Sequence, residues 1–260
     1  MKISNLLSIP NEPKVNLEYD LNKFKKFRSY SKELDFSKVI NPKLAYFIGY
    51  LQGDGCLEIN NKKISFCDEY LDHLLELKNL SENLFGFGGT IRSRISSKAK
   101  KECYLLIIHS VQLNEFIHQV FNVNLGIKNN LRIPPVILSN KDILRWYISG
   151  LFDADGTLPK NPSRVKQKFV DVTFKDKEFI LEIKQALEMF QIKTLKPYCQ
   201  VAKSPHSDYI SRTWELRIRR KEYMVRFLKE IGFAHNNKRH RATELLNLLD
   251  PWPSMDGATE

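Results

Sequence analysis

The sequence predicts an α+β protein made of two pseudo-symmetric halves, each with the element order αββαββα. Three observations predict this fold class. Residues 47–55 recur as residues 148–156, and each copy is an apolar run with small residues that ends in Asp-Gly. Similar alternations of helix-like and strand-like patterns follow both copies. The aspartates of the repeat, Asp54 and Asp155, stand about 100 residues apart, which is the length of a small domain.

The first half, residues 41–140, starts with the apolar helix that carries the first repeat. Short β-like runs follow and are separated by the turn-forming pair Asn60-Asn61. Leucines at helical spacing then predict an amphipathic helix, which nearby glycines end. The expected elements are helix Pro42–Gly53, strands 56–59 and 64–67, helix Leu71–Phe85, strands Thr90–Ile95 and 104–109, and helix 112–120.

The second half, residues 141–249, repeats this order. Its expected elements are helix 143–154, strands 157–160 and 168–174, helix 177–190, strands Tyr198–Lys203 and 213–219, and helix 222–231. Residues 121–141 join the halves, and Pro134-Pro135 predicts an extended, non-helical connection there. Residues 1–40 form an N-terminal extension without a counterpart, and residues 250–260 form a tail that we expect to be flexible.

The composition is that of an ordinary soluble globular protein, with 42% hydrophobic and 27% charged residues among 260. No run approaches the roughly 18 apolar residues of a membrane helix, and no secretory h-region is present. The four cysteines form no Cys-x-x-Cys pair, which favours reduced thiols in an intracellular protein of the cytoplasm, nucleoid or organelle matrix, not a secreted one. The six histidines show no ligand spacing and are expected to be solvated or to face DNA.

The net charge is +11, and the positive excess is spread along the chain. Such a distribution suits a long polyanion that lies across the whole molecule, because counterion release then favours binding. A basic protein with a solvated surface has the same composition, so charge alone leaves both interpretations open.

Small residues recur four positions apart on each motif helix and predict close packing of the two helices. Residues at i and i+4 share one helix face, and without bulk they let two backbones approach. This packing would bring Asp54 and Asp155 together beside the pseudo-two-fold axis. Gly55 and Gly156 are expected to end the helices in a left-handed cap. The small pairs are Gly49 with Gly53 and Gly150 with Ala154.

Two adjacent carboxylates at helix C-termini repel each other and face the negative end of a dipole. A divalent cation bound by oxygen ligands would compensate them, with Mg²⁺ as the default and Mn²⁺ or Ca²⁺ as substitutes. Such cations activate water and stabilise a leaving oxygen in phosphodiester hydrolysis. Plain core helices that end in common Asp-Gly turns are the alternative, but two copies at matched places favour the catalytic interpretation.

Both motifs resemble the signature of the LAGLIDADG homing endonucleases in their single-chain, two-motif form. The resemblance covers about residues 41–245, and the first motif departs from the pattern at Gln52. It implies that Asp54 and Asp155 are the catalytic, metal-ligating acids, with Gly53 and Ala154 completing the metal set. It also implies two four-stranded antiparallel sheets that form a saddle over the DNA major groove, with both strands cut across the minor groove.

The family also places a basic residue near the active centre late in each half, and Lys128 and Lys238 stand at the matching positions. Each could stabilise the transition-state phosphate or polarise the attacking water, or it could be a solvated lysine or a plain phosphate contact. Met1 and the short flanks leave no room for intein splicing blocks. We therefore expect a free-standing, intron-encoded monomer without an obligate protein partner.

Alternation along the strands predicts a polar, arginine-bearing face that could read bases in the major groove. An ordinary solvated sheet face would show the same pattern. Basic loops beside the strands are expected to contact phosphates, which position the protein on DNA. The candidate DNA-binding residues are Arg92, Arg94, Arg217 and Arg219 on strands and Lys98, Lys100, Lys101, Arg164, Lys166 and Lys168 in loops.

The functional hypothesis is a site-specific double-strand DNA endonuclease that acts as a monomer with a divalent metal on a long, partly degenerate target. Two alternatives remain open. The first is an RNA maturase that assists intron splicing, and the second is a DNA-binding regulator that has the fold without catalysis. The regulator is disfavoured because both Asp-Gly acids are present.

Overall fold

The computed structural model describes residues 13–16, 39–59, 62–95, 102–203 and 210–250 of the chain. Within them, two four-stranded antiparallel sheets have the same strand order, β3-β4-β6-β5 and β7-β8-β10-β9. The first half contains α2 (Pro42–Gly53), β3 (Gly55–Leu57), β4 (Lys63–Asp68), α3 (Leu71–Phe85), β5 (Thr90–Ile95), β6 (Glu102–His109) and α4 (Val111–Phe121). The second contains α6 (Lys141–Asp155), β7 (Gly156–Thr157), β8 (Val170–Phe174), α7 (Lys177–Met189), β9 (Tyr198–Lys203), β10 (Ile210–Ile218) and α8 (Lys221–Glu230). The two αββαββα halves are confirmed.

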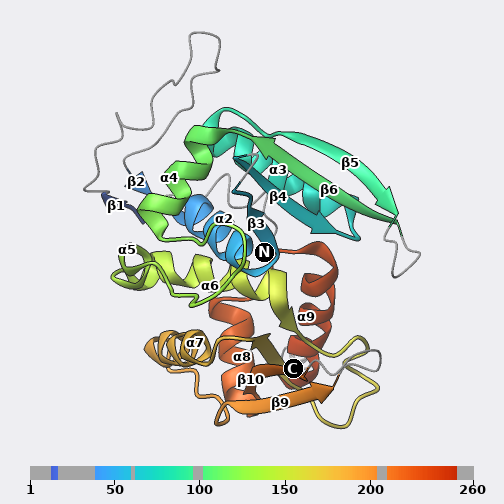
Figure 1. Ribbon diagram of the computed structural model, residues 1–260. Helices are drawn as coiled ribbons and strands as arrows, with labels where there is room; N and C mark the ends of the chain where they lie inside the picture. The colour runs from blue at the N-terminus through green and yellow to red at the C-terminus, as the bar shows by residue number, and fades with distance from the viewer. Residues whose placement is uncertain (1–12, 17–38, 60–61, 96–101, 204–209, 251–260) are drawn as a thin grey trace, which may run out of the picture.

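The two motif helices, α2 and α6, lie side by side at the centre of the molecule, with one sheet on each side of the pair (Figure 1). Asparagines begin both helices. The Asn41 side chain accepts from the backbone N–H of Leu44 at 2.9 Å, and the Asn140 side chain accepts from the N–H groups of Asp142 and Ile143. These caps satisfy amide groups that the first helical turn leaves without partners. Both central helices therefore start at defined residues.

The apolar face of each sheet packs against helices. In the first half, the Phe47 ring of α2 meets Phe66 of β4 and Phe85 of α3 edge-on, with ring centroids 5.4 and 5.6 Å apart. In the second half, Phe152 of α6 contacts Phe227 of α8 with a centroid distance of 4.8 Å. These aromatic contacts fix the motif helices in the core of each half.

Two helices differ from the sequence-based expectation. The connection between the halves contains α5 (Pro135–Leu138), so the expected non-helical link is wrong at this point. Pro134 is extended with φ −54° and ψ 127°, but Pro135 occupies the first helical position, where its missing N–H costs no hydrogen bond. The additional helix α9 (Asn236–Leu249) follows α8 and was not expected. Its buried residues Ala242, Leu245 and Leu249 do have helical spacing.

Part of the N-terminal extension pairs with the first half. Strand β1 (Val15–Asn16) lies antiparallel to β2 (Val39–Ile40), and Val15 packs against the core. The remainder of the extension lies outside the described residues, as do residues 251–260 of the expected tail.

All four cysteines are free thiols. Among the described residues, no helix combines the length and the hydropathy of a membrane-spanning segment. The intracellular location itself stays a prediction.

Candidate active site at the ends of the motif helices

The small residues of the motif helices lie where the two backbones touch. A Cβ atom on Gly49 would lie 2.0 Å from the carbonyl oxygen of Tyr147, and one on Gly150 would lie 2.2 Å from that of Tyr46. A Cβ on Gly53 would lie 2.2 Å from the Cβ of Ala154. Because these distances exclude any side chain, the predicted packing of the helices along their small residues is confirmed.

The expected left-handed caps at Gly55 and Gly156 are wrong. Asp54 is the C-cap of α2 with φ −96°, Gly55 does not have a positive φ, and Gly156 is extended with φ −72°. The glycines are required by crowding, because a Cβ on Gly55 would lie 2.4 Å from the Leu51 side chain and one on Gly156 would lie 2.4 Å from the carbonyl oxygen of Phe152. The chain therefore turns directly from each helix into the first strand of its sheet.

A pair of buried tyrosines links the two helices in a pseudo-symmetric way. The Tyr46 hydroxyl donates to Oδ2 of Asp153 at 2.7 Å, and the Tyr147 hydroxyl donates to Oε1 of Gln52. Tyr46 and Tyr147 occupy equivalent positions in the two motifs, and so do Gln52 and Asp153. The sequence pattern identified Gln52 as a departure from the motif but did not reveal these contacts.

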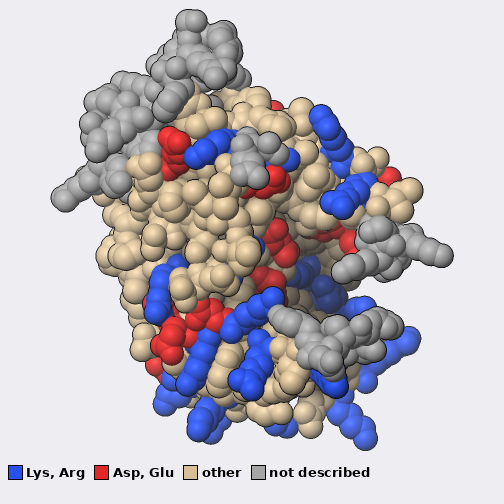
Figure 2. All heavy atoms as spheres, viewed as in Figure 1, with Lys and Arg blue, Asp and Glu red and all other residues tan. Residues whose placement is uncertain are grey.

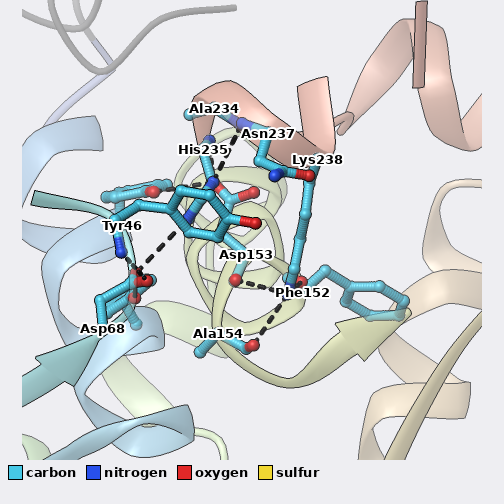
Figure 3. Close-up of polar contacts among 11 residues, drawn as sticks. Tyr46, Asp68, Phe152, Asp153, Ala154, Ala234, His235, Asn237 and Lys238 are labelled. Atoms are coloured by element: carbon cyan, nitrogen blue, oxygen red, sulfur yellow. Dashed lines mark hydrogen bonds and ion pairs between the residues drawn. The ribbon is translucent and has the colours of Figure 1, made fainter. Parts of the chain in front are cut away.

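The backbone opposite each acceptor explains why one half has an acid and the other an amide. Oδ2 of Asp153 also accepts from the backbone N–H groups of Ala234 and His235, at 2.8 and 2.9 Å (Figure 3). In the other half, Nε2 of Gln52 donates to the carbonyl oxygen of Arg132 at 3.0 Å. An anion suits the two donors, whereas an amide nitrogen suits the carbonyl. Gln52 is therefore matched to its surroundings.

The lysines predicted near the active centre both reach the last turns of the motif helices. The Lys238 ammonium donates to the carbonyl oxygens of Asp153 and Ala154 at 2.6 and 2.8 Å, and Figure 3 shows its side chain extending from α9 to this helix end. In the other half, Lys128 donates to the carbonyl oxygen of Gly53, which occupies the position in α2 that Ala154 occupies in α6. Both side chains place a positive charge where a helix leaves carbonyls without partners.

Asp54 and Asp155 stand at these same helix ends, and their charges interact. The Asp54 side chain is exposed and the Asp155 side chain is half-buried. Burial, reinforced by the charge of Asp54, raises the pKa of the Asp155 carboxyl to about 7, although Lys128 and Lys238 oppose the shift. Although solvent reaches Asp54, the protein that surrounds its carboxyl removes part of the hydration and raises its pKa, and both lysines again oppose the shift. The predicted convergence of two acids and two lysines is therefore present in the fold.

A cleft of about 910 Å³ opens beside this centre and is lined by Lys128, Asp155 and Gly53 together with residues of the second half. Figure 2 shows a hollow between the two lobes with acidic side chains inside it and Lys and Arg side chains along the lower lobe. The donor set here is carboxylate and carbonyl oxygen, which hard divalent cations prefer. Burial is the main cause of the raised pKa of Asp155, and the charge of Asp54 adds to it; a cation between the two acids would relieve this repulsion.

The candidate base-reading residues of the first half lie on an exposed part of β5. Arg92 and Arg94 are exposed there, and Ile91 packs on the core as expected. Alternation along the strand would put Ile95 on the packed face with Ile91, but Ile95 is 74% exposed because it lies at the outer end of the edge strand. The arginine-bearing face of β5 is therefore available to a ligand.

Arg217 on β10 lies in an acidic setting that the alternation pattern did not reveal. Its guanidinium pairs with Asp171 at 3.0 Å and with Glu215 at 2.7 Å, and it stacks over the ring of Phe169. Burial and the charge of Glu215 raise the pKa of Asp171 to about 6. The Arg217 side chain is thus held on the sheet by the protein itself.

The remaining candidates are surface residues. Arg219 directly follows β10 and is exposed. In the loop before β8, Arg164 and Lys166 are exposed and Lys168 is half-buried. The candidates Lys98, Lys100 and Lys101 lie outside the described residues.

Comparison with known proteins supports the repeated architecture. The family model of the LAGLIDADG-like domain matches residues 41–120 and again residues 142–232. Two curated relatives from Methanocaldococcus jannaschii match most of this chain. They are a glutamine–fructose-6-phosphate aminotransferase, 29% identical with 85% of this chain and 19% of that protein covered, and a replication factor C small subunit, 26% identical with 84% and 11% covered. The chain thus spans less than a fifth of either relative.

Solved structures share the fold at low sequence identity. The homing endonuclease I-DmoI, crystallised in complex with DNA and Ca, is 14% identical, with a TM-score of 0.51 over 78% of this chain and 96% of that one. Full-length DUF199/WhiA from Thermatoga maritima is also 14% identical, with a TM-score of 0.50 over 78% and 58% of the chains. Since the two domain matches together span most of the described core, the chain belongs to the LAGLIDADG family, with one LAGLIDADG-like domain in each half.

Proposed function

We propose that this chain is a site-specific endonuclease that cuts both strands of DNA by hydrolysing phosphodiester bonds with a divalent cation. The observation that carries the proposal is the convergence of Asp54 and Asp155 at the ends of two helices that touch through glycine. Lys128 and Lys238 lie beside them. A purely structural helix pair would gain nothing from two repelling acids at this point.

The carboxylates of Asp54 and Asp155 fit Mg²⁺, Mn²⁺ or Ca²⁺ as oxygen ligands. The carbonyl oxygens of Gly53 and Ala154 would complete the ligand set with their second lone pair, because each already accepts a hydrogen bond from Lys128 or Lys238. When bound, the cation would lower the pKa of a water molecule and neutralise charge on the leaving oxygen. The protein's own contribution is to hold the acids in place through the rigid helix contact and to balance their charge with the lysines. Rigid placement of this kind is what electrostatic catalysis requires.

Double-stranded DNA is the partner that best fits the surface. The net charge of +11 and the exposed Arg92 and Arg94 on the sheet favour a polyanion that contacts both halves. I-DmoI, which shares the fold, was crystallised with DNA. Two halves on one chain supply both acids, so we propose that a monomer suffices and that the target is long and only partly specified.

The kinds of protein that match this chain support the proposal that its coding sequence inserts into other genes. The aminotransferase and the replication factor have different names and functions by those names, yet each contains a segment similar to this chain. That segment is less than a fifth of the relative's own length. A segment shared by otherwise unrelated proteins behaves as an independent module. The intron-encoded origin stays a prediction, which the sequence around the coding region tests.

Break mapping tests the proposal. Genomic DNA from relatives of the source organism that lack this coding sequence is incubated with the protein and Mg²⁺, and new DNA ends are sequenced. We expect double-strand breaks at one or a few sites, none with EDTA, and no double-strand breaks with Asp155→Asn. Asp72→Asn, which changes an exposed acid on α3, is the matched control and should cut like the wild type.

Two other outcomes would identify the alternatives. Sequence-specific binding without breaks under any metal condition would indicate a DNA-binding regulator, a possibility that the fold shared with WhiA keeps open. Stimulated splicing of an intron RNA without DNA breaks would indicate a maturase. Either result would overturn the endonuclease proposal.

A further inference from the structure

Three side chains that are distant in the sequence meet beside the motif helices. Asp68 ends β4, His73 lies in the first turn of α3, and His235 caps α9. One metal-ligating atom from each lies within 4.8 Å of the others, and the two imidazole centroids are 4.0 Å apart. The sequence predicted scattered, solvated histidines, so this prediction is wrong for His73 and His235.

The cluster is buried and incompletely satisfied. His73 is 1% exposed, and neither of its ring nitrogens has a hydrogen-bond partner among the described residues. His235 is 4% exposed, and its Nε2 lies 3.2 Å from Oδ2 of Asp68 (Figure 3). A buried imidazole that makes no polar contact costs free energy, so the site lacks a partner for His73.

The positions of the ligand atoms suit a small transition-metal ion. Two ligands bound to one tetrahedral ion at about 2.0–2.2 Å lie about 3.3–3.6 Å apart, close to the 3.2 Å between Asp68 and His235. The ligand atom of His73 lies within 4.8 Å of the other two, so it would have to approach by up to about 1.5 Å. The Tyr70 N–H donates to Oδ1 of Asp68 at 2.9 Å, and the Tyr50 hydroxyl donates to Oδ2 at 3.1 Å. These contacts orient the carboxylate as outer partners of a metal ligand do.

Binding would change two existing contacts of His235. Nδ1 of His235 accepts from the backbone N–H of Asn237 at 3.2 Å, which leaves Nε2 to donate its proton to Asp68. A metal at Nε2 would replace the hydrogen bond to Asp68, and the neutral ring would then carry its proton on Nδ1. Because a protonated Nδ1 cannot accept, the capping bond to Asn237 would be lost as well. The Asn237 position is half-buried, so solvent can reach the start of the helix.

We propose that Asp68, His73 and His235 form a binding site for a transition metal of the Zn²⁺ or Co²⁺ class, separate from the cations at Asp54 and Asp155. Two imidazoles and one carboxylate favour such ions over Mg²⁺, which prefers oxygen ligands. Asp68 and His73 belong to the first half, and His235 belongs to the second. The metal would therefore join the two halves next to the active centre. The proposal does not depend on nuclease activity.

Cobalt titration of the full chain tests the site. Protein freed of metal with a chelator is titrated with Co²⁺, whose visible absorption reports tetrahedral coordination, in the presence of excess Mg²⁺. We expect one equivalent to bind, Zn²⁺ to displace it, and the melting temperature to rise with Zn²⁺. His73→Gln should weaken binding by about tenfold or more. His240→Gln, an exposed histidine on the same helix as the His235 cap, is the control and should bind like the wild type.

Two further measurements keep the test decisive. Asp54→Asn and Asp155→Asn should retain the cobalt band, since their carboxylates belong to the other site. X-ray absorption of the zinc-loaded wild type should show two imidazole ligands, and this result does not depend on whether His73→Gln folds. Absence of the band in the wild type, its full retention in folded His73→Gln, or a zinc shell without imidazole would each overturn the proposal.

Discussion

The hydroxyl groups of Tyr46 and Tyr147 occupy equivalent places but bind acceptors of different charge. Tyr46 donates to the buried carboxylate of Asp153, whereas Tyr147 donates to the amide oxygen of Gln52. Hydrogen bonds to a charged acceptor contribute more to stability than neutral ones. Removal of each hydroxyl therefore compares the two acceptors within one molecule.

We expect Tyr46→Phe to lower the free energy of unfolding by about 1.5–3 kcal/mol and Tyr147→Phe by about 0.5–1.5 kcal/mol. Urea denaturation followed by circular dichroism measures both values. Because the two substitutions remove the same atom from equivalent positions, each variant is the control for the other. Equal losses, or a larger loss for Tyr147→Phe, would contradict the assigned contacts.

Asp155 should make stability depend on pH. Its pKa in the folded protein is about 7, against an ordinary value of 3.8, so between these pH values the folded state keeps a proton that the unfolded state has released. The contribution of this group to stability is therefore present below the unfolded pKa and is lost as pH rises towards 7. The opposite sign would apply to an acid whose pKa is depressed.

Without divalent metal, Asp155→Asn should stabilise the protein by about 1–2 kcal/mol at pH 8 and by much less at pH 5, since solvent screening reduces the full effect of the shift. Thermal melting at the two pH values in EDTA measures the difference. The exposed Asp72→Asn should show no such pH dependence. A destabilisation by Asp155→Asn at pH 8 would contradict this prediction, because it would mean that the folded protein favours the charged carboxylate of Asp155.

At the scale of elements, the close contact of α2 with α6 leaves no room for a side chain. Alanine is normally favoured over glycine in a helix by about 1 kcal/mol. At Gly49, however, its Cβ would lie 2.0 Å from a backbone oxygen of the other helix. The helices would have to separate, and the positions of Asp54 and Asp155 would change with them.

We expect Gly49→Ala to cost several kcal/mol, roughly 3 or more, as overpacking of a rigid contact does. Gly86→Ala is the control, because Gly86 has φ +69° but no atom of the described part of the chain within 4 Å of an added Cβ. Its cost should be limited to about 1–2 kcal/mol of backbone strain. Chemical denaturation of both variants separates crowding from strain, and a neutral Gly49→Ala would argue against the helix contact.

The elements that were predictable from the sequence carry strong local signals. The Leu71–Phe85 helix follows from the spacing of its leucines, and the motif helices follow from the repeat. Helix α9 was missed because its first turn is polar and basic, and α5 was missed because paired prolines are typical of extended chain. The cluster of His73 with His235 depends on contacts between the halves, which no local pattern records.

At the scale of the whole molecule, basic residues on the sheet and in the loops should contribute to DNA binding in different ways. Those on the sheet should determine sequence specificity, and those in the loops should determine affinity. Arg94 lies on the exposed face of β5, whereas Lys166 lies in a loop. Contacts to base edges specify sequence, and contacts to phosphates act on all sequences. Arg217 is less suited to this comparison because its loss would leave Asp171 and Glu215 unpaired.

We expect Arg94→Ala to relax the sequence preference of binding at one or a few positions. Lys166→Ala should weaken binding to all sequences and reduce the slope of log K against log salt by about 1. Binding to a library of variant sites at several salt concentrations measures both effects. Equal, sequence-independent losses from the two variants would argue against a base-reading role for β5.

The central claim is that Asp54 and Asp155 act together on shared divalent cations. The most direct measurement is strand-resolved cleavage of the mapped DNA site in Mg²⁺ by the wild type, Asp54→Asn, Asp155→Asn and Asp72→Asn. We expect each active-site variant to lose at least about a hundredfold in the cleavage rate of one or both strands while its DNA affinity stays close to that of the wild type. Cleavage of both strands by either variant at nearly the wild-type rate would contradict the account.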